Sequence, residues 1–291
     1  MTFAIPFPAI DPVLIELGPL QIRWYALAYL GGILLGWWYV SRLTQNTVIF
    51  GGMASPVRPA HADDLLFFAT LGIVLGGRLG YVLFYKPGYY LDNPGEILQV
   101  WLGGMSFHGG AIGLLLACAL VARYKHLSML ALGDLAAAAA PIGLFFGRLA
   151  NFINGELWGR VSDVPWAMVF PFGGPEPRHP SQLYQAALEG LLLFAILRVL
   201  THRFHALRRP GVVTGAFFAA YGVMRIIGEQ FREPDAHIGF LVPGLTMGML
   251  LSLPMILIGG MLMHWAWHNN GHVNWQSPSN GRAEESQDGG S

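Results

Sequence analysis

Seven stretches of apolar residues, each close to 20 residues long, constrain the fold of this chain more than any other feature. Each residue of an α-helix adds about 1.5 Å, so roughly 20 apolar residues cross the ~30 Å hydrocarbon core of a bilayer. We therefore predict an all-α, polytopic membrane protein with about seven transmembrane helices. The expected helices lie near residues 22–41, 64–85, 105–123, 131–149, 182–201, 212–231 and 244–267.

The composition agrees with a protein that lies in a membrane. Charged residues make up 12% of the chain and hydrophobic residues 54%, whereas soluble domains carry about 25% charged residues. The formal net charge is zero, so we expect no nucleic acid partner. The single cysteine, Cys118, lies in an apolar run and is interpreted as a packing residue. His264 and His268 have metal-like spacing but no third ligand nearby, so we interpret them as interfacial anchors and expect no metal or cofactor.

The chain is expected to form one transmembrane domain, residues 1–269, followed by a polar and disordered cytoplasmic tail, residues 270–291. The proline-rich connection at about 150–181 predicts a small extracytoplasmic cap. The first 18 residues hold three prolines and two acids. They lack the basic start and apolar core of a cleavable signal peptide, so we expect this segment to be retained.

An odd number of helices puts the two termini on opposite sides of the membrane. Loops on the cytoplasmic side carry an excess of basic residues. That rule predicts an outward N-terminus and a cytoplasmic C-terminus. The basic residues that share the predicted cytoplasmic side are Arg42, Arg58, Arg123, Lys125, Arg203, Arg208, Arg209 and Arg282.

Polar residues gather at the opposite, outer end of the fourth apolar stretch. Polar groups at the edge of the hydrocarbon are costly without partners, and they commonly mark functional sites. An ordinary polar loop that caps a helix is the alternative. The segment 147–160, GRLANFINGELWGR, contains Arg148, Asn151, Asn154, Glu156 and Arg160.

The segment YGVMRIIGEQFREPD predicts an ionic stripe on the sixth helix. Tyr221, Arg225, Glu229 and Arg232 are spaced four, four and three residues apart, which places them on one face of a helix. Such a stripe has to face the interior of the bundle or a wet cavity. Arg225 and Glu229 can pair with each other, but two arginines for one glutamate leave positive charge to spare.

Further polar residues map to the same outer half. His108 lies among glycines at the start of the third stretch, and Tyr25 at the start of the first. Arg78 could join the same cavity, and the segment RHPSQLY, residues 178–184, combines polar groups with a helix start. Asp134, on the inner side, is interpreted as a helix N-terminal acid that suits the helix dipole.

A cavity with surplus arginine suits an anionic ligand, and phospholipid head groups are the abundant anions of a membrane. Histidine suits proton transfer. We find no activated nucleophile, because Ser106 lacks a GxSxG setting. An enzyme built this way would use a nucleophile carried by its substrate. A secondary transporter of an organic or lipid anion is the alternative, although matching half-chain repeats are not apparent. Ser106 and His108 are too close along the chain for the triad of an intramembrane protease.

Four motifs together resemble the bacterial prolipoprotein diacylglyceryl transferase family. They are GRLANFINGELWG, GGMSFHGG, RHPSQLYQ and YGVMRIIGEQFREPD, and the likeness runs over residues 18–267. Ala150 stands where many members have glycine. The resemblance implies transfer of a diacylglyceryl group from phosphatidylglycerol to the lipobox cysteine of a preprolipoprotein signal peptide. A thioether forms and glycerol-1-phosphate leaves, as the first step of lipoprotein maturation in the bacterial inner membrane.

The resemblance also implies roles for individual residues. We expect His108 to accept or relay the thiol proton, and Arg148 and Arg225 to hold the head-group phosphate. The residues expected to orient the lipid and the arginines are Tyr25, Asn151, Glu156, Gly159, Tyr221, Glu229 and Arg232.

Overall fold

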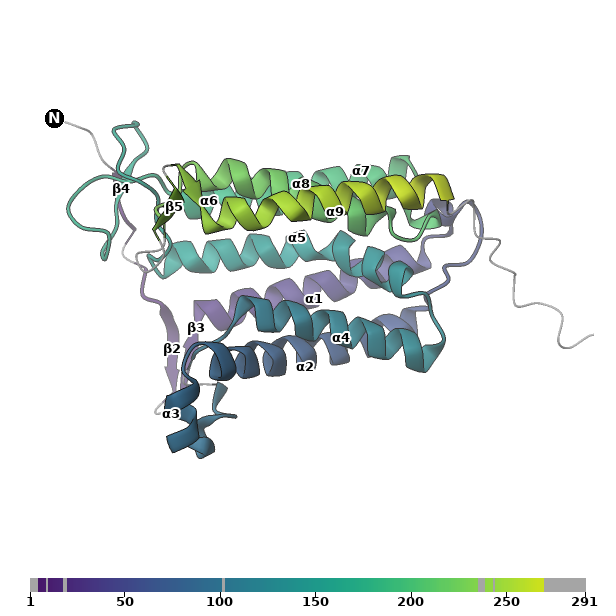
Figure 1. Cartoon of the computed structure of the whole chain (residues 1–291), viewed down its shortest axis with the longest axis horizontal. Helices are drawn as coiled ribbons and strands as arrows, with labels where there is room; N and C mark the ends of the chain where they lie inside the picture. Colours follow the sequence, from purple (N-terminus) through teal and green to yellow (C-terminus); the bar gives the residue numbers. More distant parts are fainter. Residues whose placement is uncertain are drawn as a thin grey trace, which may run out of the picture.

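A bundle of long helices forms the body of the protein (Figure 1). The computed structural model describes residues 5–8, 10–17, 20–100, 103–234, 239–242 and 244–269. The predicted tail, residues 270–291, lies outside them. The long helices are α1 (Trp24–Gln45), α2 (Pro59–Phe84), α4 (Phe107–Lys125), α5 (Met129–Ile153), the continuous rod of α6 (Ser181–Gln185), η4 (Ala186–Leu192) and α7 (Leu193–Arg203), α8 (Val212–Glu229) and α9 (Met247–Asn269).

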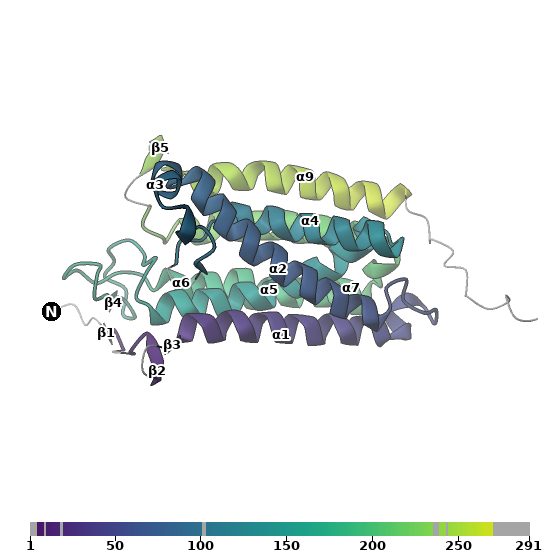
Figure 2. The same ribbon diagram turned by 90° about the horizontal axis from the view of Figure 1, so that it is seen from below.

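These seven rods correspond one by one to the seven expected segments, and the all-α fold class is confirmed. Among the described residues, five rods are long and apolar enough to cross a membrane: α2, α5, α6–η4–α7, α8 and α9. The other two, α1 and α4, have 22 and 19 residues and run alongside them (Figures 1 and 2). The chain is a multi-pass membrane protein.

The chain starts and finishes its helical part at opposite ends of the bundle. Strand β1 (Ile5–Pro6) lies near the first residues of α1 and α6, and α9 runs from that end to the other (Figures 1 and 2). We call the end with β1 the N-terminal end. It also holds the last turns of α5 and α8.

Glycines bring α2 and α4 into backbone contact. Gly72, Gly76 and Gly80 recur every four residues on α2, and they face Gly109 and Gly113 of α4. A Cβ atom added at Gly80 would lie 2.9 Å from Cα of Gly109. Small residues at this spacing let membrane helices approach closely enough for dispersion forces to hold them. The glycine-rich setting predicted for His108 is therefore the packing surface of α4.

Short strands and helices occupy the loops, and the all-α expectation did not anticipate the strands. A hairpin precedes α1, and a parallel two-strand pairing joins β1 to the connection after α5. Within the described residues, the connection between α5 and α6 contains no helix. The shorter elements are β2 (Val13–Leu17), β3 (Leu20–Arg23), β4 (Met168–Val169), β5 (Phe240–Val242), β6 (Leu245–Thr246), α3 (Pro87–Asp92), η1 (Thr47–Phe50), η2 (Pro94–Glu96) and η5 (Ala206–Arg208).

Asp134 stabilises a different helix from the one predicted. The N-cap of α5 is Ser128, and Asp134 lies inside that helix with 1% of its surface exposed. Its carboxylate accepts hydrogen bonds from the backbone N–H of Gly211 and of Thr214, both at 2.8 Å, and from the Thr214 hydroxyl at 2.7 Å. Gly211 and Thr214 form the start of α8, whose unpaired N–H groups need acceptors. Asp134 thus fixes α8 against α5.

We expect Gly113→Ala to destabilise the bundle. The new methyl group would overlap the backbone oxygen of Gly72, so α2 and α4 would have to separate. Such overpacking costs about 1–3 kcal/mol, more than the helix propensity that alanine gains over glycine. Gly260→Ala in α9 is the matched control, since a Cβ there meets nothing within 4 Å. Thermal unfolding in detergent should show a lower midpoint for Gly113→Ala alone, and equal midpoints would contradict the packing argument.

Candidate active site

Three helices bring oppositely charged side chains together near the N-terminal end of the bundle. Glu189 of η4 accepts hydrogen bonds at Oε2 from Nε and Nη2 of Arg148, at 3.1 and 2.9 Å. Its Oε1 lies 3.4 Å from Nη1 of Arg225. The Glu189 side chain is completely buried, and each arginine is 14% exposed. One carboxylate therefore links α5 to α8.

Glu189 is the main residue that the sequence analysis missed. The estimate of two arginines for one glutamate counted a single segment. With Arg148 and Glu189 included, the ion pairs join three arginines to two glutamates, and one positive charge is still in excess. A signal was present in the sequence. Glu189 is a lone acid inside an otherwise apolar transmembrane segment, which by itself indicates a functional or paired group.

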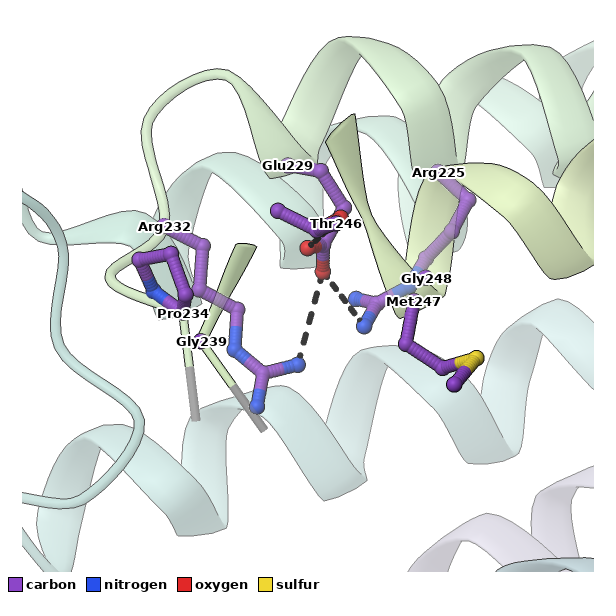
Figure 3. Close-up of a pocket in the computed structure, with 8 residues that line it drawn as sticks. All are labelled: Arg225, Glu229, Arg232, Pro234, Gly239, Thr246, Met247 and Gly248. Atoms are coloured by element: carbon purple, nitrogen blue, oxygen red, sulfur yellow. Dashed lines mark hydrogen bonds and ion pairs between the residues drawn. The ribbon is translucent and has the colours of Figure 1, made fainter. Parts of the chain in front are cut away.

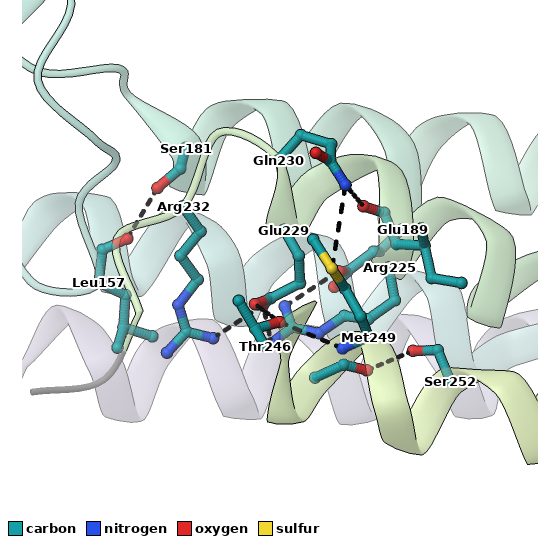
Figure 4. Close-up of polar contacts among 12 residues, drawn as sticks. Leu157, Ser181, Glu189, Arg225, Glu229, Gln230, Arg232, Thr246, Met249 and Ser252 are labelled. Carbon is teal, nitrogen blue, oxygen red and sulfur yellow. Dashed lines mark hydrogen bonds and ion pairs between the residues drawn. The ribbon is translucent and has the colours of Figure 1, made fainter. Parts of the chain in front are cut away.

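The end of α8 adds a second carboxylate to the cluster. The Glu229 carboxylate forms ion pairs with Nη2 of Arg225 at 2.6 Å and with Nη1 of Arg232 at 3.5 Å. It also accepts a hydrogen bond from the Thr246 hydroxyl at 2.8 Å (Figure 4). The predicted pairing of Arg225 with Glu229 is confirmed. The prediction that all four residues lie on one helix is wrong for Arg232, because α8 ends at Glu229. Arg232 still reaches the carboxylate from the following turn.

A small pocket opens beside this second carboxylate (Figure 3). Side chains of both signs face it, and the first turn of α9 closes one wall. A Cβ added at Gly248 would lie 2.9 Å from the Glu229 carboxylate carbon, so the glycine makes room for that carboxylate. The pocket is lined by Arg225, Glu229, Arg232, Pro234, Gly239, Thr246, Met247 and Gly248.

Gly159 allows three backbone segments to meet beside the cluster. A Cβ there would lie 2.5 Å from the carbonyl oxygens of both His179 and Phe231. Its neighbour Arg160 donates to the carbonyls of Arg232 and Glu229, at 3.1 and 3.3 Å. The connection after α5 is thereby tied to the end of α8. The observed role of Gly159 is close packing of backbone, which only glycine permits.

Asn151, Glu156 and Tyr25 form a second polar group at the end of α5. Asn151 Nδ2 donates to Glu156 Oε1 at 2.7 Å, and the Tyr25 hydroxyl interacts with both side chains. The backbone carbonyl of Glu156 accepts from Gln182 at 2.6 Å. Asn151 lies one turn after Arg148 on α5, so the two groups are neighbours along that helix.

Tyr221 lies next to the ionic cluster. It is one turn before Arg225 on α8, and its ring stacks on Phe217 with a centroid separation of 5.7 Å. The charged groups that act on its hydroxyl include Glu189, Arg225 and Arg148. The structure therefore groups Tyr221 with the residues expected to bind an anion.

His108 lies on α4, outside the three helices that carry the ion pairs of Glu189. It is an exposed residue in the first turn of α4, which packs on α2. The preceding residue, Ser106, caps α4 by accepting from the backbone N–H of Gly109 at 3.2 Å. Ser106 is thus a structural cap, and the His108 side chain is exposed. The charged cluster itself is built on α5, η4 and α8.

Arg78 does not join the cluster, contrary to expectation. Its side chain is 1% exposed and lies under the loop that follows α3. All three nitrogens of its guanidinium donate hydrogen bonds to backbone carbonyls, so Arg78 fixes the loop and is not available to an anion. It donates to the carbonyls of Glu96 at 2.6 Å, of Ile97 at 2.8 Å and of Gly104 at 3.3 Å, and also to that of Gly103.

The segment at residues 178–184 makes polar contacts that fix the connection between α5 and α6. Arg178 donates to Gly173 at 2.8 Å and pairs with Glu233 at 3.1 Å. His179 lies 3.1 Å from the Tyr184 hydroxyl, and partial burial lowers the pKa of His179. The helix starts at Ser181 as expected. The Ser181 hydroxyl, however, donates to the Leu157 carbonyl at 2.8 Å and does not cap the helix (Figure 4).

No group of three His, Cys, Asp or Glu side chains suited to a metal ion occurs within the described ranges. The ring centroids of His264 and His268 lie 4.3 Å apart, and the ring planes are tilted by 36° to each other. Cys118 is 3% exposed and unpaired in the core, as its interpretation as a packing residue requires.

Comparison with known sequences identifies the family. The profile described as prolipoprotein diacylglyceryl transferase matches residues 12–265. The chain belongs to this family. A relative from Rhodospirillum rubrum is 61% identical over 262 residues, covering 89% of this chain and 93% of its own length. One from Nitrobacter winogradskyi is 56% identical over 269 residues, or 92% of each chain. Both are named phosphatidylglycerol–prolipoprotein diacylglyceryl transferase.

The matched range contains the whole ionic cluster of this family member. Arg148, Glu189, Arg225, Glu229 and Arg232 all lie between residues 12 and 265. The cluster is therefore part of the family domain.

Proposed function

We propose that this protein transfers a diacylglyceryl group from phosphatidylglycerol to the lipobox cysteine of a preprolipoprotein. Family membership over residues 12–265 supports the reaction class. The observation that carries the site is the convergence of Arg148 and Arg225 on one buried carboxylate, within a bundle of apolar helices. Buried arginine pairs suit the phosphate of a lipid head group.

The reaction is a substitution at carbon. The cysteine sulfur forms a bond to the diacylglyceryl carbon that carries the phosphate, and the thiol gives up its proton. The C–O bond to that phosphate breaks, and its electron pair leaves with glycerol-1-phosphate. The products are a thioether and a phosphate monoester.

Arg148 and Arg225 would stabilise the charge that grows on the departing phosphate. In many enzymes, preorganised hydrogen-bond donors at low dielectric make the largest single contribution to the rate enhancement, because they stabilise charge that develops in the transition state. Here Glu189 and Glu229 already hold the two guanidinium groups in place. Little reorganisation is then needed when the leaving group develops charge.

The thiol nucleophile has an unperturbed pKa of about 8.5, so most of it is protonated at neutral pH. His108 is the proposed acceptor or relay for its proton, because histidine exchanges protons near neutral pH. Its exposed place at the start of α4 gives a substrate access to the ring.

The remaining polar residues would shape the lipid site. Glu229 orients Arg225 and Arg232 through ion pairs at 2.6 and 3.5 Å. Asn151, Glu156 and Tyr25 would contact the head group beside Arg148, and Tyr221 would do so from α8. Gly159 acts by permitting the cap to close on the end of α8.

We place the protein in the bacterial inner membrane, with the N-terminal end of the bundle on the outer side. The basic loops then lie in the cytoplasm, in agreement with the charge rule for membrane proteins. Residues 1–269 form the catalytic domain, and residues 150–181 its extracytoplasmic cap. The substrates are phosphatidylglycerol and a signal peptide with a lipobox cysteine. A secondary transporter is not supported, because the family and its relatives are named as transferases.

We expect purified protein in detergent to add one diacylglyceryl unit to a lipobox peptide when phosphatidylglycerol is present. Arg148→Ala and Arg225→Ala should each lower the rate by at least about a hundredfold, which is typical when a donor to the developing charge is removed. Arg123→Ala, an exposed residue in the last turn of α4, is the control and should keep full activity. Peptide mass and released glycerol phosphate provide the measurement. Full activity of either cluster variant would refute the arginine role.

We expect His108→Asn to slow transfer at neutral pH by about 10²–10⁴-fold, the usual contribution of a positioned acid or base. The loss should shrink as the pH rises toward the thiol pKa, because the substrate thiolate then forms without help. Initial rates between pH 6.5 and 9 test this. Wild-type rates for His108→Asn across that range would remove the proton role and leave arginine electrostatics as the sole activation.

A further inference from the structure

Glu189 bridges two arginines from different helices while having no exposed surface of its own. A carboxylate buried at this depth loses its hydration, and only good ionic partners compensate. It takes two N–H groups of Arg148 on one oxygen and approaches Arg225 with the other. Its position is therefore fixed by the two residues expected to bind phosphate.

The local backbone is specialised at this residue. Ala186–Leu192 is a π-helical turn between the α-helical segments α6 and α7. π turns are rare, contain one extra residue and occur mostly at functional sites. Gly190 lets the turn sit against α5, because a Cβ there would lie 2.7 Å from Cβ of Phe145. The turn and the glycine together aim Glu189 at Arg148.

The bridge also determines which N–H groups remain for a ligand. Arg148 uses Nε and Nη2 on Glu189, and its Nη1 has no hydrogen bond to the described part of the chain. Arg225 uses Nη1 on Glu189 and Nη2 on Glu229. Glu189 thus fixes the planes of both guanidinium groups and leaves an edge of Arg148 available to an anion.

We propose that Glu189 is a positioning residue that holds Arg148 and Arg225 in register and limits how tightly the site retains the phosphate product. This inference rests on the proposed transferase function. Without Glu189, the two like charges would repel and the guanidinium groups would turn apart.

The second part of the inference follows from the charges of substrate and product. A phosphodiester carries one negative charge, whereas a phosphate monoester carries about 1.5 to 2 near pH 7. Loss of one carboxylate charge raises the affinity of the site for both the phosphodiester substrate and the monoester product. The increase is larger for the monoester, because it carries more negative charge. Glu189 therefore favours release of glycerol phosphate over its retention.

The test compares wild-type protein with Glu189→Gln, which has nearly the same shape but no charge. Transfer rates are measured over a range of phosphatidylglycerol concentrations, with added glycerol-1-phosphate as inhibitor. We expect kcat to fall at least about tenfold. The inhibition constant of glycerol phosphate should fall at least about fivefold, with a smaller change in KM. Glu233→Gln is the matched control, because its carboxylate pairs with Arg178 outside the cluster and is 46% exposed. Its constants should stay within about twofold of wild type.

A purely structural role would lower the yield of folded protein without changing the inhibition constant. That result, or wild-type kcat and inhibition constant in Glu189→Gln, would overturn the inference while leaving the transferase function intact. Transfer absent from the wild-type protein would instead overturn both. If Glu189→Gln does not fold, Glu189→Asp keeps the charge but is one methylene shorter. It should lower kcat and leave the inhibition constant unchanged; a wild-type kcat would overturn the positioning role.

Discussion

The buried ionic contact between Glu189 and the arginines Arg148 and Arg225 is the constraint on which the site depends. Charges inside an apolar bundle are tolerated only when they are paired, so α5, η4 and α8 have to keep a fixed relation to one another. The same contact orients two guanidinium groups without using all their donors. The contacts that stabilise the bundle are therefore the same ones that would prepare the proposed phosphate site.

The rest of the fold supports that contact from a distance. Asp134 fixes the first turn of α8 by accepting from Gly211 and Thr214 at the opposite end of the helix. Arg160 holds the last turn of α8 through two backbone carbonyls. With both ends held, Arg225 on α8 has little freedom to slide or rotate. The glycine contacts of α2 with α4 fix the first turn of α4, which carries His108, so the proposed proton acceptor lies on a different helix from the proposed phosphate-binding arginines.

The seven apolar stretches predicted the helices because hydrophobic length is a direct physical requirement of a bilayer. The pairing of Arg225 with Glu229 was also predictable, since four residues on a helix bring side chains together. Contacts between residues distant in sequence could not be predicted in this way. Glu189 lies 41 residues after Arg148, and Asp134 lies 77 residues before Gly211. Helical periodicity carries no information about such contacts. Arg78 was assigned to the cavity for the same reason, because its carbonyl acceptors lie in a loop about 20 residues away.

We propose that the arginine cluster binds the phosphate of an anionic lipid. Native mass spectrometry of the protein in detergent, with equal amounts of phosphatidylglycerol and phosphatidylethanolamine, tests it most directly. Wild-type protein should retain phosphatidylglycerol preferentially, and the Arg148→Ala, Arg225→Ala double variant should lose that preference. Lys86→Ala, an exposed cation at the same end of the bundle, should behave as wild type. An unchanged preference in the double variant would show that the arginines do not bind the lipid phosphate.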